Sequence, residues 1–154
     1  MSGAVNGRAL MAALLALVAL AWWASPPSAD ARAAAAQAAV IAPYAADVAA
    51  GRLAEARAQW TSARFQAEVS EIVFLAAQAR NRDELGAPVT LTWDGSPPEV
   101  VPGAEGTMLR LPATAQGPNG ALSVLIDVVE TDDGWRIDGT WTRPKGGVGV
   151  ERVF

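Results

Sequence analysis

Few side chains in this sequence can carry acid–base, nucleophilic or metal chemistry. The chain has no histidine and no cysteine, and Tyr44 is its one tyrosine. Histidine is the commonest general base near neutral pH and the commonest metal ligand, and cysteine supplies thiolate nucleophiles, disulfides and iron–sulfur ligands. The sequence also lacks a metal-ligand cluster and a Gly-rich phosphate loop, so we expect no metal and no cofactor. Catalysis would fall to Asp, Glu, Ser or Lys.

Asp127 is the carboxylate whose position best suits a catalytic base. It lies inside a predicted strand, beside Val128. The other candidates fall at predicted turns or on faces expected to be exposed: Asp94, Asp132, Asp133 and Asp138. A carboxylate becomes a base near neutral pH where an apolar site raises its pKa. The alternation that buries Val128 turns Asp127 to the opposite face, so we favour an exposed or cross-strand-paired residue. A base in a pocket is the alternative.

The aromatic residues suit packing or binding better than catalysis. Tyr44 lies at core spacing on a predicted helix, so we expect a helix residue with its hydroxyl at the rim of the core, and a catalytic donor is the alternative. Tryptophans bury a large area, which favours core packing for those in the body of the chain. The alternative is an aromatic-lined ligand pocket formed by Trp60, Trp93 and Trp141.

Composition excludes several classes of protein. Hydrophobic residues make up 51% of the chain and charged residues 18%, a composition that excludes a disordered chain. The length of 154 residues is enough for one domain. Twelve basic residues against 16 acidic ones give a net charge of −4. A nucleic-acid-binding protein normally has the opposite balance, because neutralising phosphates supplies much of its affinity. We therefore expect no nucleic-acid partner.

Residues 1–31 have the order of a signal peptide. Arg8 precedes an apolar run over residues 9–24, and a Ser-Pro-Pro-Ser stretch leads to the small-residue sequence Ala29-Asp30-Ala31. Cleavage after Ala31 is the favoured interpretation. The alternative is an uncleaved membrane anchor over residues 9–24, shorter than the ~20 residues of a full span but with the paired tryptophans Trp22 and Trp23 near its end. With cleavage, we expect a periplasmic or secreted protein. Without it, we expect a domain anchored in the inner membrane and lying outside the cytoplasm.

The first half of the body is predicted to be helical. Most of the alanines precede residue 88, and alanine is the best helix former. We expect helices over 33–50, with a kink at Pro43, over 53–60, and from a cap at Thr61 or Ser62 to a stop at Gly86. The apolar stripe expected on the third helix is Phe65, Val69, Ile72, Val73, Ala76 and Ala79.

The second half alternates with the period of strands. We expect four strands, over 89–93, 107–115, 121–130 and 135–141, with tight turns at 117–120 and 131–134. In the last strand Trp135, Ile137 and Trp141 are expected to face the core, and Arg136, Asp138 and Thr140 to face outward. Helices followed by an antiparallel meander define an α+β domain, here residues 32–144 with a tail over 145–154.

These motifs resemble those of a known superfamily. The most specific one is a long apolar strand, an acidic turn and Asp133-Gly134-Trp135-Arg136-Ile137-Asp138-Gly139. The others are Gly51-x-x-x-x-Ala56, Trp60, Phe65, Leu85-Gly86 and Pro102-Gly103-x-x-Gly106. Over about residues 35–143 the chain resembles small exported bacterial proteins of the nuclear-transport-factor-2-like (cystatin-like) superfamily, including families of unknown function. The resemblance implies a bent sheet wrapped around helices, a cone whose mouth can hold a ligand.

Three classes of function follow. The first is an exported, non-catalytic domain that binds a small apolar ligand or a partner protein. The second is a membrane-anchored assembly subunit of an envelope complex. The third is an isomerase-like enzyme, as the resemblance implies for some members, using Asp127 as a lone carboxylate base. The first class is favoured because the sequence lacks histidine, cysteine and a metal-ligand cluster. The resemblance does not choose between the classes, because fold alone does not determine function.

Overall fold

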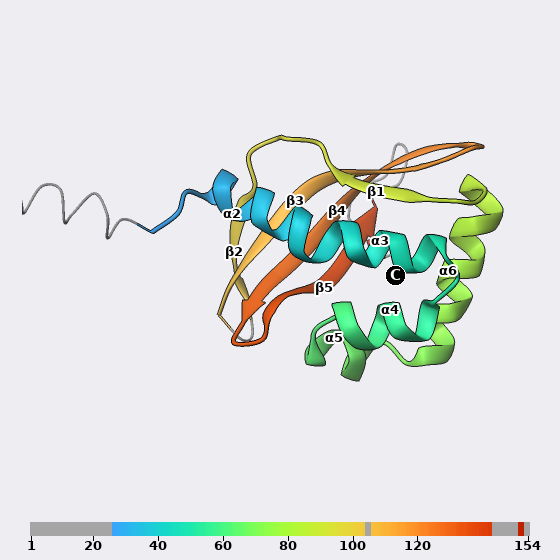
Figure 1. The fold of residues 1–154 in the computed structure, drawn as a ribbon, viewed down its shortest axis with the longest axis horizontal. Coiled ribbons are helices and arrows are strands. Elements are labelled where there is room, and N and C mark those ends of the chain that lie inside the picture. Colours follow the sequence, from blue (N-terminus) through green and yellow to red (C-terminus); the bar gives the residue numbers. More distant parts are fainter. Residues whose placement is uncertain (1–25, 104–105, 143–150, 153–154) are drawn as a thin grey trace, which may run out of the picture.

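The chain folds into N-terminal helices packed against an antiparallel sheet (Figure 1). A computed structural model describes residues 26–103, 106–142 and 151–152. The helical elements are α2 (Ala29–Ala36), the π-helix η1 (Gln37–Ile41), α3 (Ala42–Ala49), α4 (Leu53–Trp60), α5 (Ala63–Glu68) and α6 (Glu71–Leu85). The α+β class expected from the sequence is therefore confirmed.

The sheet has more strands than the four expected. They are β1 (Thr90–Trp93), β2 (Glu99–Gly103), β3 (Gly106–Gly117), β4 (Gly120–Thr131), β5 (Gly134–Thr142) and β6 (Glu151–Arg152). Their order is β1-β3-β4-β5-β6, and β2 pairs with the other half of β3. The strand β2 was not predicted; it has five residues, too few for an alternating pattern to stand out. The strand β6 has two residues and lies in the C-terminal tail, where a short edge strand was one of the two alternatives.

Part of the expected organisation lies outside the described residues. Residues 1–25, which include the apolar run over 9–24, are not described, and the tail expected over 145–154 is described at 151–152 alone. Ala29-Asp30-Ala31 forms the first turn of α2, whose N-cap Ser28 accepts a hydrogen bond from the Ala31 amide at 3.2 Å. Among the described helices, none is both long and apolar enough to cross a membrane.

A π-helical turn accommodates Pro43. The helical run from α2 to α3 is continuous along one face of the sheet (Figure 1), and η1 occupies its middle. The Ala42 amide bonds the Gln37 carbonyl, five residues earlier instead of four. Proline has no N–H, so an ordinary helix would lose one bond at Pro43. The sequence predicts a kink at Pro43, and the structure has a wider, π-helical turn directly before this proline.

A break at Val69 and Ser70 divides the third predicted helix into α5 and α6. Ser62 caps α5 as expected, and its hydroxyl accepts from the Phe65 amide at 3.0 Å. Ser70 caps α6, and this new start resets the helical phase. Consequently Ile72 is 80% exposed, although the continuous stripe placed it in the core. The buried residues of α6 are instead Phe74, Ala77, Gln78 and Leu85.

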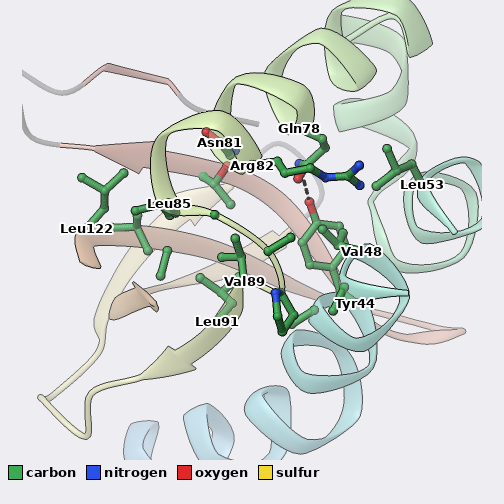
Figure 2. Close-up of a pocket in the computed structure, with 18 of the residues that line it drawn as sticks. Tyr44, Val48, Leu53, Gln78, Asn81, Arg82, Leu85, Val89, Leu91 and Leu122 are labelled. Carbon is green, nitrogen blue, oxygen red and sulfur yellow. Dashed lines mark hydrogen bonds between the residues drawn. The ribbon is translucent and has the colours of Figure 1, made fainter. Parts of the chain in front are cut away.

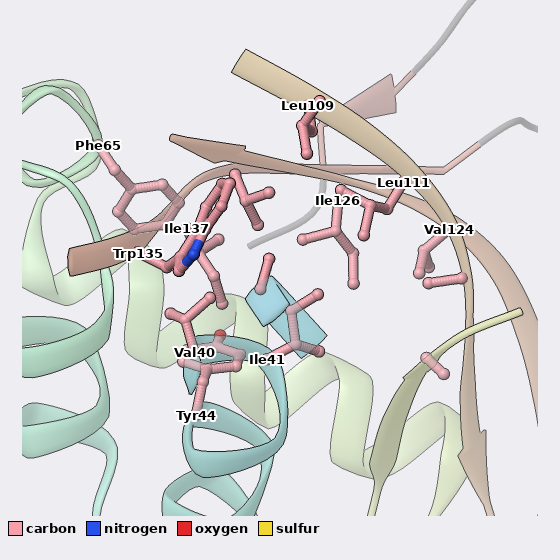
Figure 3. Close-up of a cluster of buried hydrophobic side chains, with 14 of the residues drawn as sticks. Val40, Ile41, Tyr44, Phe65, Leu109, Leu111, Val124, Ile126, Trp135 and Ile137 are labelled. Carbon is pink, nitrogen blue, oxygen red and sulfur yellow. The ribbon is translucent and has the colours of Figure 1, made fainter. Parts of the chain in front are cut away.

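The core lies between the helical run and one face of β3, β4 and β5 (Figure 3). The two expected tight turns are confirmed, since β3 and β4 join through Pro118-Asn119 and β4 and β5 through Asp132-Asp133. Side chains that alternate along the strands meet the helices. The buried members labelled in Figure 3 are Val40, Ile41, Tyr44, Phe65, Leu109, Leu111, Val124, Ile126, Trp135 and Ile137.

A bulge in β5 reverses part of the expected alternation. Asp127 pairs with Gly139 and Val128 with Ile137, so Asp138 has no partner across the ladder. An extra residue of this kind shifts the inward and outward faces by one position. Trp135 and Ile137 face the core as expected.

Beyond the bulge, the expectation for β5 is wrong. Asp138 and Thr140 are buried instead of exposed, at 4% and 8%. Trp141 leaves the core face and bonds Asp127, which the sequence alternation had placed on the opposite side of the sheet. The physical reason is the slipped register, which local alternation does not reveal.

Candidate functional site

A cavity of about 90 Å³ lies where α3 and α6 meet β1 and the ends of the long strands (Figure 2). Its apolar wall comes from α3, the start of α4, the end of α6, β1 with the segment leading into it, and β3 and β4. The principal members of that wall are Val48, Leu53, Leu85, Val89, Leu91, Ala115, Leu122 and Val124. Polar side chains at the cavity are Tyr44, Gln78, Asn81, Arg82, Thr140 and Thr142. An apolar space with a few polar groups is the usual composition of a small-molecule site.

Tyr44 and Gln78 form a buried polar pair at this cavity. The Gln78 side-chain amide donates to the Tyr44 hydroxyl at 3.2 Å, and Tyr44 is 6% exposed (Figure 2). Burial raises the pKa of Tyr44, against a smaller opposite effect from Gln78. The phenol therefore stays neutral at physiological pH. The hydroxyl was expected at the rim of the core, whereas the structure places it inside, on the wall of the cavity.

One face of α6 supplies the remaining polar wall. Gln78, Arg82 and Leu85 are spaced by four and three residues, which aligns them along the helix. Arg82 is exposed, and of the described residues that line the cavity it is the one with a charged side chain. Within the described part of the chain, its guanidinium makes no hydrogen bond or ion pair. Gly86 ends the helix with a positive φ of 78°, as expected for a helix stop.

A second, shallower cavity of about 290 Å³ adjoins the first. It lies between α3 and β1, and both cavities share the wall formed by Ala45, Ala49, Val89 and Leu91. Gln37 of η1 closes its far side, where its side-chain oxygen accepts from the Trp93 amide at 2.7 Å. Ala45 and Ala49 of α3 have small side chains and line both cavities together with Leu91, which leaves space at this contact between α3 and β1.

Asp127 is paired across the ladder, which is one of the environments expected for it. It is 1% exposed and lies opposite Arg110 in the ladder. The Arg110 guanidinium donates to its two carboxylate oxygens at 2.8 and 2.9 Å, and the Trp141 indole donates to one of them at 2.7 Å. Asp127 lines neither of the two cavities described here. Its contacts therefore explain its burial without a catalytic role.

Each of the three tryptophans proposed for a pocket has a polar partner of its own. Trp60 donates its indole N–H to Asp47 at 2.6 Å, and Trp93 donates to the Ser96 carbonyl at 2.9 Å. The Trp141 indole donates to Asp127, and the Arg110 guanidinium carbon lies over the Trp141 ring, 6.0 Å from the ring centre. None of the three lines either cavity described above. A binding role for them stays a prediction.

Asp138 takes part in a second buried network that the sequence did not suggest. The Ser62 hydroxyl donates to its carboxylate, and Arg64 forms an ion pair with it. These contacts join the start of α5 to the bulge in β5, where the Ser62 amide also donates to the Ile137 carbonyl at 2.8 Å. Bonding to Asp138 raises the pKa of Arg64. The network fixes the helix against the sheet edge.

Two polar residues of the cavity, Gln78 and Arg82, were not predicted from the sequence. Gln78 and Arg82 fall outside the continuous stripe drawn from Phe65, because the break before α6 changes the helical phase. Ser70 was the local signal, since serine is a preferred N-cap. Among the described residues, no group of three or more His, Cys, Asp or Glu side chains is placed to hold a metal ion.

Comparison of the chain with family models, with curated proteins and with solved structures found no match.

Proposed function

We propose that this protein is an exported, non-catalytic domain whose cavity between α3 and α6 binds a small, largely apolar molecule. The observation that carries the proposal is the cavity itself, with apolar walls and a buried Tyr44–Gln78 pair. Buried polar groups fix the orientation of a ligand, while apolar walls supply most of the binding free energy. Both features favour binding over structure alone.

The proposal includes the finer expectations from the sequence. A cone-shaped fold like that of the nuclear-transport-factor-2-like superfamily would place such a cavity at its mouth, and the helices-then-sheet order supports this assignment. Export to the periplasm or beyond rests on Arg8, the apolar run over 9–24 and Ala29-Asp30-Ala31. An isomerase-like reaction is less favoured, because both oxygens of Asp127 are occupied by Arg110.

A cavity-filling substitution tests the binding function. Ala49 lines both cavities, so Ala49→Leu adds volume where a ligand would lie. Ala54 on α4 lines neither, and Ala54→Leu is the matched control. We expect hexan-1-ol to bind the native protein and the control in calorimetric titrations, and to bind Ala49→Leu much more weakly. Equal binding to all three proteins, or none to any, would contradict a ligand site here.

A membrane-anchored assembly subunit is the second candidate. The observation in its favour is an apolar group at the start of α6, where Ile72, Val73 and Leu75 are 80%, 46% and 37% exposed. Exposed apolar groups of this kind suit contact with a partner protein. Mass spectrometry of the protein from its native host separates the two candidates. A chain beginning at Arg32 supports the exported domain, and one retaining residues 9–24 supports the anchored subunit.

A further inference from the structure

We infer that the molecule bound in this cavity carries a carboxylate, which pairs with Arg82 at the cavity wall while a short apolar body lies against Leu85, Leu91 and Leu122. The inference rests on the proposed binding function and narrows it to a class of ligand. It adds a charge to a site otherwise described by apolar walls and a neutral hydrogen-bonded pair.

The state of Arg82 is the first argument. Within the described residues, several arginines already have carboxylate partners, namely Arg32, Arg52, Arg64 and Arg110. Arg82 makes no such contact in that part of the chain, although it lines a largely apolar cavity. A guanidinium beside low-dielectric walls attracts an anion more strongly than one facing water alone. Arg82 is therefore a cation at the wall of an apolar cavity that has no carboxylate partner among the described residues.

The chemistry of the surrounding wall is the second argument. Among the described residues that line this cavity, none is acidic. Tyr44 adds no negative charge, because burial raises its pKa and keeps the phenol protonated. Gln78 lies four residues before Arg82 on α6 and can donate hydrogen bonds beside it. Figure 2 shows Arg82 and the Tyr44–Gln78 bond toward one side of the cavity, with Leu85 and Leu122 toward the other.

Geometry selects a carboxylate of modest size. Arginine presents two parallel N–H groups that match the two oxygens of a carboxylate. The cavity, at about 90 Å³, is smaller than the roughly 150 Å³ apolar cavity known to hold benzene. The apolar part of the ligand is therefore a short chain or a small ring, with its charged end near the exposed guanidinium.

Hexanoate and hexan-1-ol are suitable probes, since they share a six-carbon chain and differ in charge. Both are titrated calorimetrically into the full chain purified from its native host, in lipid nanodiscs if residues 9–24 are retained, with empty nanodiscs as the blank. The variant is Arg82→Gln. The matched control is Arg80→Gln, also exposed and on α6 but not lining the cavity.

We expect hexanoate to bind the native protein about tenfold more tightly than hexan-1-ol, as for a charged hydrogen bond that is partly exposed. Arg82→Gln should weaken hexanoate binding to about the affinity for hexan-1-ol, while Arg80→Gln should change the binding of neither probe. Equal affinities of the native protein for both probes, or unchanged hexanoate binding to Arg82→Gln, would overturn the carboxylate inference and leave the cavity function standing. No binding of either probe would overturn both.

Discussion

The pair between Arg110 and Asp127 gives the sharpest test of how this sheet is built. Asp127 is almost fully buried on β4, and Arg110 reaches it from the neighbouring position on β3. Arg110→Met keeps an unbranched side chain beside Trp141 but removes the charge and both hydrogen bonds. The carboxylate would then retain the indole N–H as its described donor, at 2.7 Å.

The magnitude follows from the unequal exposure of the two partners. Removing one partner of a buried ion pair costs about 3–5 kcal/mol, because a charge is left buried without compensation. The Arg110 side chain is 29% exposed, so water screens part of its interaction. We therefore expect a loss of about 2–3 kcal/mol in the free energy of unfolding. At a urea dependence of about 1–3 kcal/mol per molar, the midpoint falls by about 1 M.

Urea denaturation followed by tryptophan fluorescence measures this loss. Arg136→Met is the control, because Arg136 also lies on a strand but forms no ion pair within the described residues, and it should cost less than about 0.5 kcal/mol. A double-mutant cycle with Asp127→Asn should give a coupling energy above about 1 kcal/mol. Equal losses for the two arginine variants, with a coupling near zero, would refute the buried pairing.

Three further predictions concern packing and pH. Gly117→Ala should lower the free energy of unfolding by about 1–3 kcal/mol, seen as a lower melting temperature in circular dichroism, because its Cβ would overlap the carbonyl oxygen at the end of α6. Trp135→Ala should cost about 3–5 kcal/mol in urea, since Trp135 belongs to the core; an unchanged midpoint would mean that it is exposed. Hydrogen bonds from Trp60 and then Arg52 lower the pKa of Asp47, so its contribution is present above the ordinary pKa and is lost as pH falls through the lowered one. Trp60→Phe should therefore move acid unfolding, followed by circular dichroism, to higher pH.

Signals between near neighbours made the class and much of the core predictable. Alternation over residues 121–130 predicts β4, and an acidic-Gly turn predicts the hairpin that leads to Trp135 and Ile137 on the core face. Ser62 before Phe65 predicts the cap of α5. These features depend on residues a few positions apart, where propensity and periodicity act directly.

The candidate site depended on contacts between distant parts of the chain. Tyr44, Gln78, Arg82, Leu122 and Thr140 meet at one cavity although they span nearly a hundred residues. A continuous helical stripe excluded Gln78 and Arg82, and strict alternation placed Thr140 on the outside. Each error came from extending one period through a point where the chain changes phase.

The sequence by itself determined an α+β chain with helices first, tight hairpins, and a chemistry without histidine or cysteine. Tertiary structure decided which residues meet. The bulge at Asp138 sends Trp141 to Asp127 and Thr140 to the cavity, and the break at Ser70 turns Ile72 outward and Gln78 toward Tyr44. The physical reason is that a one-residue shift moves every following side chain to the other face. Contacts between distant residues, across the sheet and between helices, decide where such a shift occurs.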